Sequence, residues 1–369
     1  MRGFGTVAAA VAWASATLAS AALAAPVPTR VEVVASGLDH PWSLAFLPGG
    51  SVLVTERNGK LKRIEGGRMF PVSGVPAVYN EGQGGLFDVV AHPDFNNNGL
   101  IFLSYAYGTK RANGTRVARA RLVGNSLIEV TPIYTATPLK SGPVHFGARM
   151  AFLPDGTFLL TTGDGFDFRE RAQKLDSPLG KVMRLTTDGK APGDNPFAGK
   201  PEAQPGIFTL GHRNPQGLAF DPVRRVMFEH EHGPKGGDEV NILKPGANYG
   251  WPVATFGMDY SGATVSPYTQ YKGMTQPILH WTPSIAPSGL AVYRGAMFPE
   301  WQGDLLVGAL VDKEVRRVHL SPEGKVLGQE SLFRQVGERI RDVRVAPDGS
   351  IWLTTDNPAG KVLRVTRAG

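Results

Sequence analysis

Short runs of alternating apolar and polar residues recur along the chain, and each run is followed by a tight-turn signal and a second run. Alternation with a period of two is typical of β-strands, because successive side chains point to opposite faces. Turns such as Pro154-Asp155-Gly156 make the flanking strands antiparallel neighbours. The sequence therefore predicts paired strands in six segments: residues 42–55, 86–105, 149–160, 217–229, 289–308 and 342–353.

The spacing of these segments predicts the fold class. They begin roughly 45 to 70 residues apart, which suits a four-stranded propeller blade with its loops. We therefore predict an all-β protein, a six-bladed β-propeller of four-stranded antiparallel blades. The last strand, at 360–365, is predicted to complete a blade opened by residues 30–34 and so to join the two chain ends. A β-sandwich of hairpins is the alternative.

The beginning of the chain has the features of a secretory signal peptide. Arg2 is followed by an alanine-rich apolar stretch that ends in Ala22-Leu23-Ala24, a small-x-small cleavage pattern. The stretch is too short and too weakly apolar for a membrane anchor. We predict that residues 1–24 are removed, that residues 25–369 form a single catalytic domain, and that the protein is periplasmic or secreted without membrane insertion.

Composition excludes several functional classes. The 369 residues include no cysteine, which excludes disulfide scaffolds, zinc fingers and thiol catalysis. The 46 glycines and 29 prolines fit many short strands joined by turns. The net charge is +7, but the basic residues are dispersed and form no arm for nucleic acid. A small anionic ligand fits this charge better.

Candidate chemistry lies in the loops between the repeats, because a propeller gathers such loops around one mouth of its channel. These loops contain an amide, a histidine, several arginines and an acidic glycine-rich segment, at 81–85, 144–149, 211–217, 231–241 and 337–342. Each is individually explained as well by a turn or a solvated surface. Together they suit a ligand with several carboxylates, held by guanidinium groups, and calcium or magnesium held by oxygen atoms.

Three ordered motifs carry a specific resemblance. They are Gly-His-Arg-Asn-Pro-Gln-Gly at 211–217, Glu-His-Gly-Pro-Lys-Gly-Gly-Asp-Glu-Val-Asn at 231–241 and Asn-Tyr-Gly-Trp-Pro at 248–252. In these motifs the chain resembles the soluble aldose sugar dehydrogenases that depend on pyrroloquinoline quinone (PQQ), relatives of soluble quinoprotein glucose dehydrogenase. The resemblance extends from 40–42 to 339–343. It implies a six-bladed propeller that oxidises the C1 hydroxyl of aldose sugars to the lactone, with PQQ and Ca²⁺ as cofactors.

The resemblance also implies roles for individual residues. His145 matches the catalytic general base, and Arg213 is the second catalytic candidate, as a group that polarises the quinone together with Ca²⁺. The implied cofactor-binding residues are Gln83, Arg213, Asn214, Tyr260, Lys313, Arg339 and Arg341. The implied metal-binding residues are Gly233 and Pro234 for the calcium of the cofactor, and Glu239 and Tyr249 for a further calcium.

The residue types are consistent with this mechanism. Oxidation of an alcohol needs a base for the hydroxyl proton, and neutral imidazole is suited to that role near neutral pH. We expect Arg213, Arg339 and Arg341 to disfavour the imidazolium form of His145. No side chain accepts a hydride, so an organic cofactor must do so.

Two positions depart from the family pattern. Val311 stands where the family commonly has a cofactor-binding lysine, so either Lys313 replaces it or one contact is lost. In an extended chain Val311 and Lys313 would share one face, and the long lysine side chain would cover the offset. Val144 precedes His145, where glucose dehydrogenase relatives carry an acid.

Other functions remain open at the level of sequence. One is a calcium-dependent six-bladed hydrolase of the lactonase type, and another is a non-catalytic binding propeller. A transition metal on His230 or His232 is a weaker alternative to calcium. The sequence does not identify the preferred sugar or the electron acceptor, and it leaves open whether the protein is a monomer or a dimer.

Overall fold

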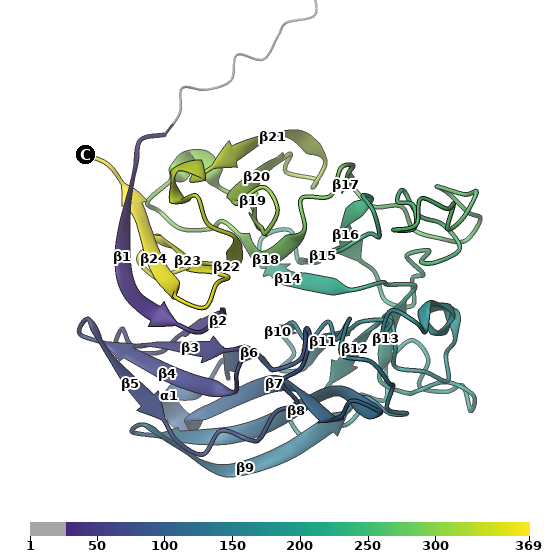
Figure 1. Ribbon diagram of the computed structural model, residues 1–369, viewed down its shortest axis with the longest axis horizontal. Helices are drawn as coiled ribbons and strands as arrows, with labels where there is room; N and C mark the ends of the chain where they lie inside the picture. The colour runs from purple at the N-terminus through teal and green to yellow at the C-terminus, as the bar shows by residue number, and fades with distance from the viewer. Residues whose placement is uncertain (1–26) are drawn as a thin grey trace, which may run out of the picture.

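The computed structural model describes residues 27–369. In this part of the chain six four-stranded sheets are arranged in a ring (Figure 1), which confirms the predicted all-β six-bladed propeller. The predicted signal peptide at 1–24 lies outside the described residues. Within them, no helix is both long enough and apolar enough to cross a membrane.

Five blades are built from consecutive strands, each running from the innermost strand at the channel to the outermost strand. The first two are β2 (Pro41–Phe46), β3 (Val52–Glu56), β4 (Lys60–Glu65) and β5 (Arg68–Val72), then β6 (Leu86–Ala91), β7 (Leu100–Thr109), β8 (Ala112–Val123) and β9 (Ser126–Thr135). The third is β10 (Met150–Phe152), β11 (Phe158–Thr162), β12 (Lys181–Leu185) and β13 (Ile207–Leu210). The fourth and fifth are β14 (Pro215–Asp221), β15 (Val226–Glu231), β16 (Asp238–Leu243) and β17 (Leu279–Trp281), then β18 (Pro287–Val292), β19 (Leu305–Ala309), β20 (Glu314–Leu320) and β21 (Val326–Leu332).

The sixth blade joins the two ends of the described chain. It contains β22 (Ile340–Val345), β23 (Ile351–Thr355) and β24 (Gly360–Arg367), and its outermost strand is β1 (Thr29–Leu38). β1 pairs antiparallel with β24, with Val31 opposite Val365, and Figure 1 shows the purple β1 beside the yellow β24. The predicted closure of the ring is therefore confirmed. Within residues 27–369, helical structure is limited to α1 (Phe95–Asn98) and the 3₁₀ turns η1 (Arg169–Gln173), η2 (Pro299–Trp301) and η3 (Arg334–Val336).

Each predicted segment supplies the two inner strands of a blade. These strands are less strictly alternating in burial than their sequence suggests, and all five residues of β3 and of β11 are buried. The reason is that apolar clusters fill the space between neighbouring blades on both faces of each sheet. Leu53 of the first blade, for example, packs in one cluster with Val89 and Ile101 of the second.

Buried ion pairs close the channel. Nη1 of Arg149 lies 3.1 Å from Oδ1 of Asp342 and 3.5 Å from Oδ1 of Asp88. Arg344 pairs with the same two aspartates, at 2.8 Å from Asp342 and 3.0 Å from Asp88. Arg149 immediately precedes β10 and Asp342 belongs to β22, in the opposite blade, so their pair crosses the channel. The cavities at the two mouths share no lining residue and are therefore separate.

Candidate functional site

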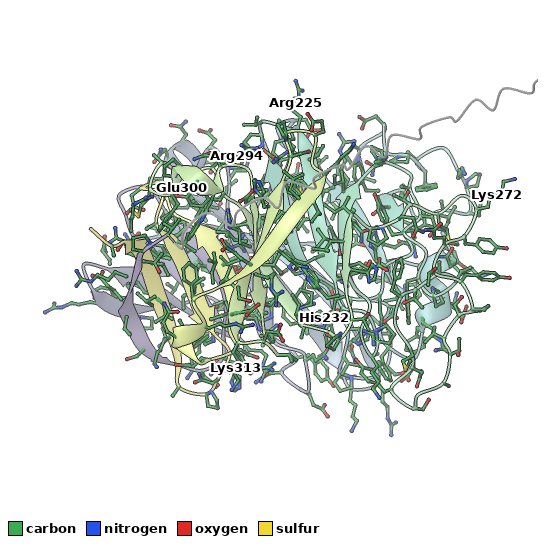
Figure 2. All side chains as sticks on the ribbon, turned by 90° about the horizontal axis from the view of Figure 1, so that it is seen from above. Arg225, His232, Lys272, Arg294, Glu300 and Lys313 are labelled. Atoms are coloured by element: carbon green, nitrogen blue, oxygen red, sulfur yellow. The ribbon has the colours of Figure 1, made fainter. Side chains whose placement is uncertain are left out.

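A cavity of about 300 Å³ lies at one mouth of the channel, a size suited to a small organic ligand. Its walls come from loops of several blades and include Trp42, Gln83, Asn214, Arg339 and Arg341. Figure 2 shows the lining residue His232 towards one end of the propeller, on the side away from Arg225 and Arg294. As predicted, the inter-blade loops converge on a single site.

Positive charge dominates this cavity. Three arginines line it, Arg57, Arg339 and Arg341, against one carboxylate, Asp356. Oδ2 of Asp356 lies 2.9 Å from Arg341 and 3.3 Å from Arg339. Burial alone would raise the pKa of Asp356, but the charges of Arg341, Arg339 and Arg57 outweigh it and lower that pKa. Two positive charges remain for an anionic ligand.

His145 stands beside the cavity and is fixed by a buried carboxylate. Its Nδ1 lies 2.7 Å from Oδ1 of Asp164. Asp164 also accepts hydrogen bonds from the main chain of Phe166 and, at 2.8 Å, from Nε1 of Trp251. Because a carboxylate can only accept here, Nδ1 of His145 carries the proton and Nε2 is left as the basic atom.

The backbone at His145 is strained in a way that the neighbouring loops support. Its φ of 54° lies in the left-handed region, and Gly147 and Ala148 follow with φ values of 65° and 81°. The side-chain oxygen of Gln83 accepts a hydrogen bond from the His145 amide at 2.8 Å. Gln83 therefore positions the histidine in addition to lining the cavity.

Burial keeps the His145 ring neutral. It is the largest cause that lowers the pKa of His145, and the positive charges of Arg213 and Lys140 act in the same direction, while Asp164 opposes them. The predicted direction is therefore confirmed. Its main cause is different from the one expected, because Arg339 and Arg341 pair with Asp356 instead.

A second cavity, of about 280 Å³, also lies close to His145. Asp164, Arg213 and Trp251 line it, together with two exposed aromatic residues, Phe166 and Tyr260, whose rings stack at 6.4 Å. Phe166 packs edge-on against the His145 ring, with centroids 5.2 Å apart. Tyr260 therefore belongs to this second cavity and not to the first. His145 is therefore adjacent to two spaces that could each hold a small molecule, although its own side chain lines neither.

Arg213 and Asn214 connect the two cavities. Asn214 lines the first, where its side-chain oxygen accepts a hydrogen bond from Gly147 at 3.3 Å. The Arg213 guanidinium lies 5.4 Å from the Trp251 ring centroid and 5.8 Å from that of Tyr260. It also donates a 2.7 Å hydrogen bond to the main-chain oxygen of Gly233.

The predicted metal ligands separate into two places. Gly233, Glu239 and Tyr249 line a third cavity of about 10 Å³, room for a single ion or water. Pro234 lines the second cavity instead. The phenol of Tyr249 already donates to Ile242 O at 2.7 Å, so its carbonyl is the atom left for a metal.

Buried acids surround this third cavity. His212, Glu229 and Glu231 bring potential ligand atoms within 4.8 Å of one another, and Glu231 stands opposite Glu239 in the ladder of β15 and β16. Burial and the charge of Glu231 raise the pKa of both Glu229 and Glu239 well above the ordinary value. Oε1 of Glu229 has no hydrogen-bond partner within the described residues. The group fits a hard cation such as Ca²⁺, which would offset the repulsion.

The structure corrects the prediction for Lys313. Residues 310–313 form a turn, with Lys313 exposed at a φ of 53°, so the extended chain assumed for Val311 and Lys313 is wrong. Val311 lines the first cavity, whereas Lys313 is absent from the described residues that do so. Figure 2 shows Lys313 at the outer edge of the molecule, at the same end as His232.

A comparison with protein families identifies this architecture. The model for glucose/sorbosone dehydrogenases matches residues 38–364. The chain belongs to the glucose/sorbosone dehydrogenase family. Its close relatives include proteins named aldose sugar dehydrogenase, and the chain is accordingly an oxidoreductase.

Individual relatives match nearly the whole of this chain. The aldose sugar dehydrogenase YliI of Escherichia coli is 42% identical over 360 residues, which cover 95% of this chain and 96% of the relative. The crystal structure of the soluble aldose sugar dehydrogenase of E. coli in the apo form matches with a TM-score of 0.89 at 40% identity, over 92% of this chain and 100% of that one. A PQQ-bound aldose sugar dehydrogenase of Streptomyces coelicolor matches with a TM-score of 0.73 at 29% identity, over 92% of this chain and 99% of that one.

Sequence analysis missed several residues of this site. Asp164 was missed although Gly163-Asp164-Gly165 directly follows the buried strand β11, a place where a lone acid between glycines is conspicuous. Glu229 and Glu231 alternate on β15 and so share one face, which was a signal for a metal site. Arg57 and Asp356 carried no such signal, because only the folded ring brings them to the cavity.

Proposed function

We propose that this protein is a periplasmic PQQ- and Ca²⁺-dependent aldose sugar dehydrogenase that oxidises the C1 hydroxyl of an aldose to the lactone. One observation carries the proposal: His145, with Nδ1 held by Asp164, adjoins an arginine-lined cavity through Phe146 and an aromatic cavity through Phe166. A base where the two cavities adjoin would take the proton of an alcohol that is held directly against an electron-accepting anion. The names of the relatives agree with this chemistry.

The residues of the first cavity fit PQQ. This cofactor is a flat tricarboxylate with a quinone, and the cavity offers arginine forks for carboxylates beside amide groups from Gln83 and Asn214. The main-chain oxygens of Gly233 and Pro234, which line the neighbouring cavities, are the candidate ligands for its calcium, and the Gly233 oxygen would exchange its hydrogen bond from Arg213 for the ion. When bound, PQQ supplies the hydride acceptor that no side chain can provide, and Ca²⁺ supplies a Lewis acid.

The protein's own residues supply the acid–base chemistry. Nε2 of neutral His145 takes the proton from the C1 hydroxyl of the sugar. Asp164 stabilises the positive charge that then develops on the imidazole and keeps the ring oriented. The Arg213 guanidinium, which lines the sugar-sized second cavity, stabilises negative charge that develops on oxygen nearby.

The remaining parts of the proposal concern location, calcium and partners. Residues 1–24 direct export and are removed, so residues 25–369 act in the periplasm as one domain. A second Ca²⁺, held by Glu239 and the carbonyl of Tyr249 among buried acids, has a structural role. The substrate partner is an aldose, the electron acceptor is a separate redox partner, and the enzyme acts as a monomer or a dimer.

Reconstitution tests this function directly. We expect purified protein with PQQ and Ca²⁺ to reduce an artificial electron-acceptor dye when it is supplied with aldoses. Without PQQ we expect no reduction of the dye. A panel of monosaccharide and disaccharide aldoses identifies the preferred substrate. If holo-protein leaves the dye oxidised with every sugar but hydrolyses a lactone, the hydrolase alternative is correct.

The structure itself gives little support to a hydrolase of the lactonase type. Such an enzyme holds a metal on free carboxylates at the channel centre. Here Asp88 and Asp342 are occupied by Arg149 and Arg344, and Asp356 is occupied by Arg339 and Arg341.

The pH dependence of turnover reports on His145 and Asp164. Because the pKa of His145 is lowered in the fold, the base stays neutral and kcat is retained below the ordinary histidine pKa near 6.5. In Asp164→Asn the opposing carboxylate is lost, so the acidic limb moves to still lower pH. We expect kcat to fall about ten- to hundredfold, because the amide no longer fixes the proton on Nδ1. An acidic limb that moves to higher pH would contradict this role.

A further inference from the structure

We propose that Arg57 binds a carboxylate of PQQ and takes the place of the lysine that the family has at the position of Val311. This inference rests on the proposed function, because it assumes that PQQ occupies the first cavity. It concerns a residue with no predicted role, on the first blade, which lines the same cavity as Val311 of the fifth blade.

The fold fixes Arg57 at the cavity. Arg57 directly follows β3, its amide donates to His40 O at 3.2 Å, and its carbonyl accepts from Leu86 N at 3.0 Å. Gly85 leaves room for the arginine stem: a Cβ built there would lie 2.6 Å from Cγ of Arg57. The half-buried side chain therefore lines the cavity from a constrained backbone, beside the loop before β6 that holds Gln83.

Arg57 is the cavity arginine with a free guanidinium. Arg339 and Arg341 both pair with Asp356. Within residues 27–369 the Arg57 guanidinium has no hydrogen bond or ion pair of its own, although its charge also acts on Asp356. A partly buried arginine without a carboxylate partner in an enclosed cavity is prepared to bind one from a ligand.

The number of cations also favours this assignment. PQQ has three carboxylates, and Arg339 and Arg341 share their charge with Asp356, so two arginines alone do not balance the ligand. Lys313 lies on an exposed turn and is not among the described residues that line the cavity, and Val311 is apolar. Arg57 is the third cation that lines the cavity.

The test is titration of apo-protein with PQQ at fixed Ca²⁺, read by quenching of tryptophan fluorescence, since Trp42 lines the cavity. We expect Arg57→Gln to raise the Kd about ten- to hundredfold, and Arg57→Lys to raise it less. Adding Val311→Lys to Arg57→Gln should recover most of the loss. Lys272→Gln is the matched control, because it removes one exposed positive charge far from the cavity (Figure 2) and should leave the Kd within about twofold.

A neutral analogue tests whether the contact is to a carboxylate. We expect Arg57→Gln to change the affinity for PQQ trimethyl ester by less than about twofold, since the ester carries no charge to pair. Thermal melting of each apo-variant checks that the fold is intact, and Arg57→Lys keeps the test available if the glutamine variant is unstable. Unchanged PQQ affinity in Arg57→Gln, or an equal loss in Lys272→Gln, overturns the assignment. Wild-type protein that fails to bind PQQ overturns the proposed function as well.

Discussion

We expect His145→Ala to lower kcat by about 10²- to 10⁴-fold, the usual contribution of general-base catalysis, while PQQ affinity changes little. The histidine ring contacts Asp164 and Phe166 and does not itself line the arginine-rich cavity. Removal of the ring therefore takes away the proton acceptor and leaves the carboxylate-binding groups in place. Steady-state turnover with a dye acceptor and a separate PQQ titration measure the two effects independently.

Two controls make this result specific. His280→Ala removes an exposed imidazole that stacks on Phe256, outside the described cavities, and should leave turnover unchanged. His145→Ala should also lose the acidic limb of the pH profile, because the group that titrates is gone. A His145→Ala enzyme with near-normal turnover would remove the histidine from the mechanism and leave it a structural residue with a strained backbone.

The propeller was predictable from sequence because its signals are local. Alternation and turn residues identify strand pairs without reference to the rest of the chain, and each predicted pair became the inner half of a blade. Even the pairing of β1 with β24, the longest-range contact of the fold, followed from two strand patterns left without partners at the chain ends. The outer strands were less visible, because their exposed faces are mixed in polarity.

The site was predictable only in part, because its residues meet through the ring and not along the sequence. Family motifs located His145, Arg213 and Arg339, which lie in recognisable loops. They could not show that Lys313 sits on a turn at positive φ, since strand or turn geometry at 310–313 depends on how β19 meets β20. Nor could they show that Arg57 lines the cavity, because its side chain has room there only where Gly85, which precedes the next blade, has no Cβ.

Removal of calcium should abolish sugar oxidation and lower the melting temperature by several degrees. A ligand at a hundred times its Kd stabilises a fold by about 2.7 kcal/mol, and its loss shifts Tm by roughly 1–2 °C per kcal/mol in a chain of this length. The structural reason is the acid group around Glu231 and Glu239, where buried carboxylates face one another with few donors. Calorimetry with and without a chelator, at constant ionic strength, measures the shift.

The sign of the pH effect separates this site from a surface effect of calcium. The pKa values of Glu229 and Glu239 are raised in the fold. The folded protein is therefore more stable at low pH, where these carboxyls are protonated, and its free energy of unfolding falls as the pH rises through the raised pKa values. The chelated protein should therefore lose more stability at pH 8 than at pH 5, and calcium should restore it.

An acid-to-amide variant distinguishes the buried site from any other. Glu239→Gln removes one charge from the group, so the chelated protein should be at least as stable as the chelated wild type, while the rise of Tm with calcium should shrink or vanish. Glu202→Gln, at an exposed position away from the group, should keep the full calcium response. If Glu239→Gln responds to calcium as the wild type does, the ion that stabilises the fold is bound elsewhere. The buried acids then destabilise the fold without binding that ion. If a bound cation relieves repulsion between the buried carboxylates, Glu239→Gln must have two effects. It must raise or preserve the Tm of the chelated protein, and it must reduce the rise in Tm that calcium causes.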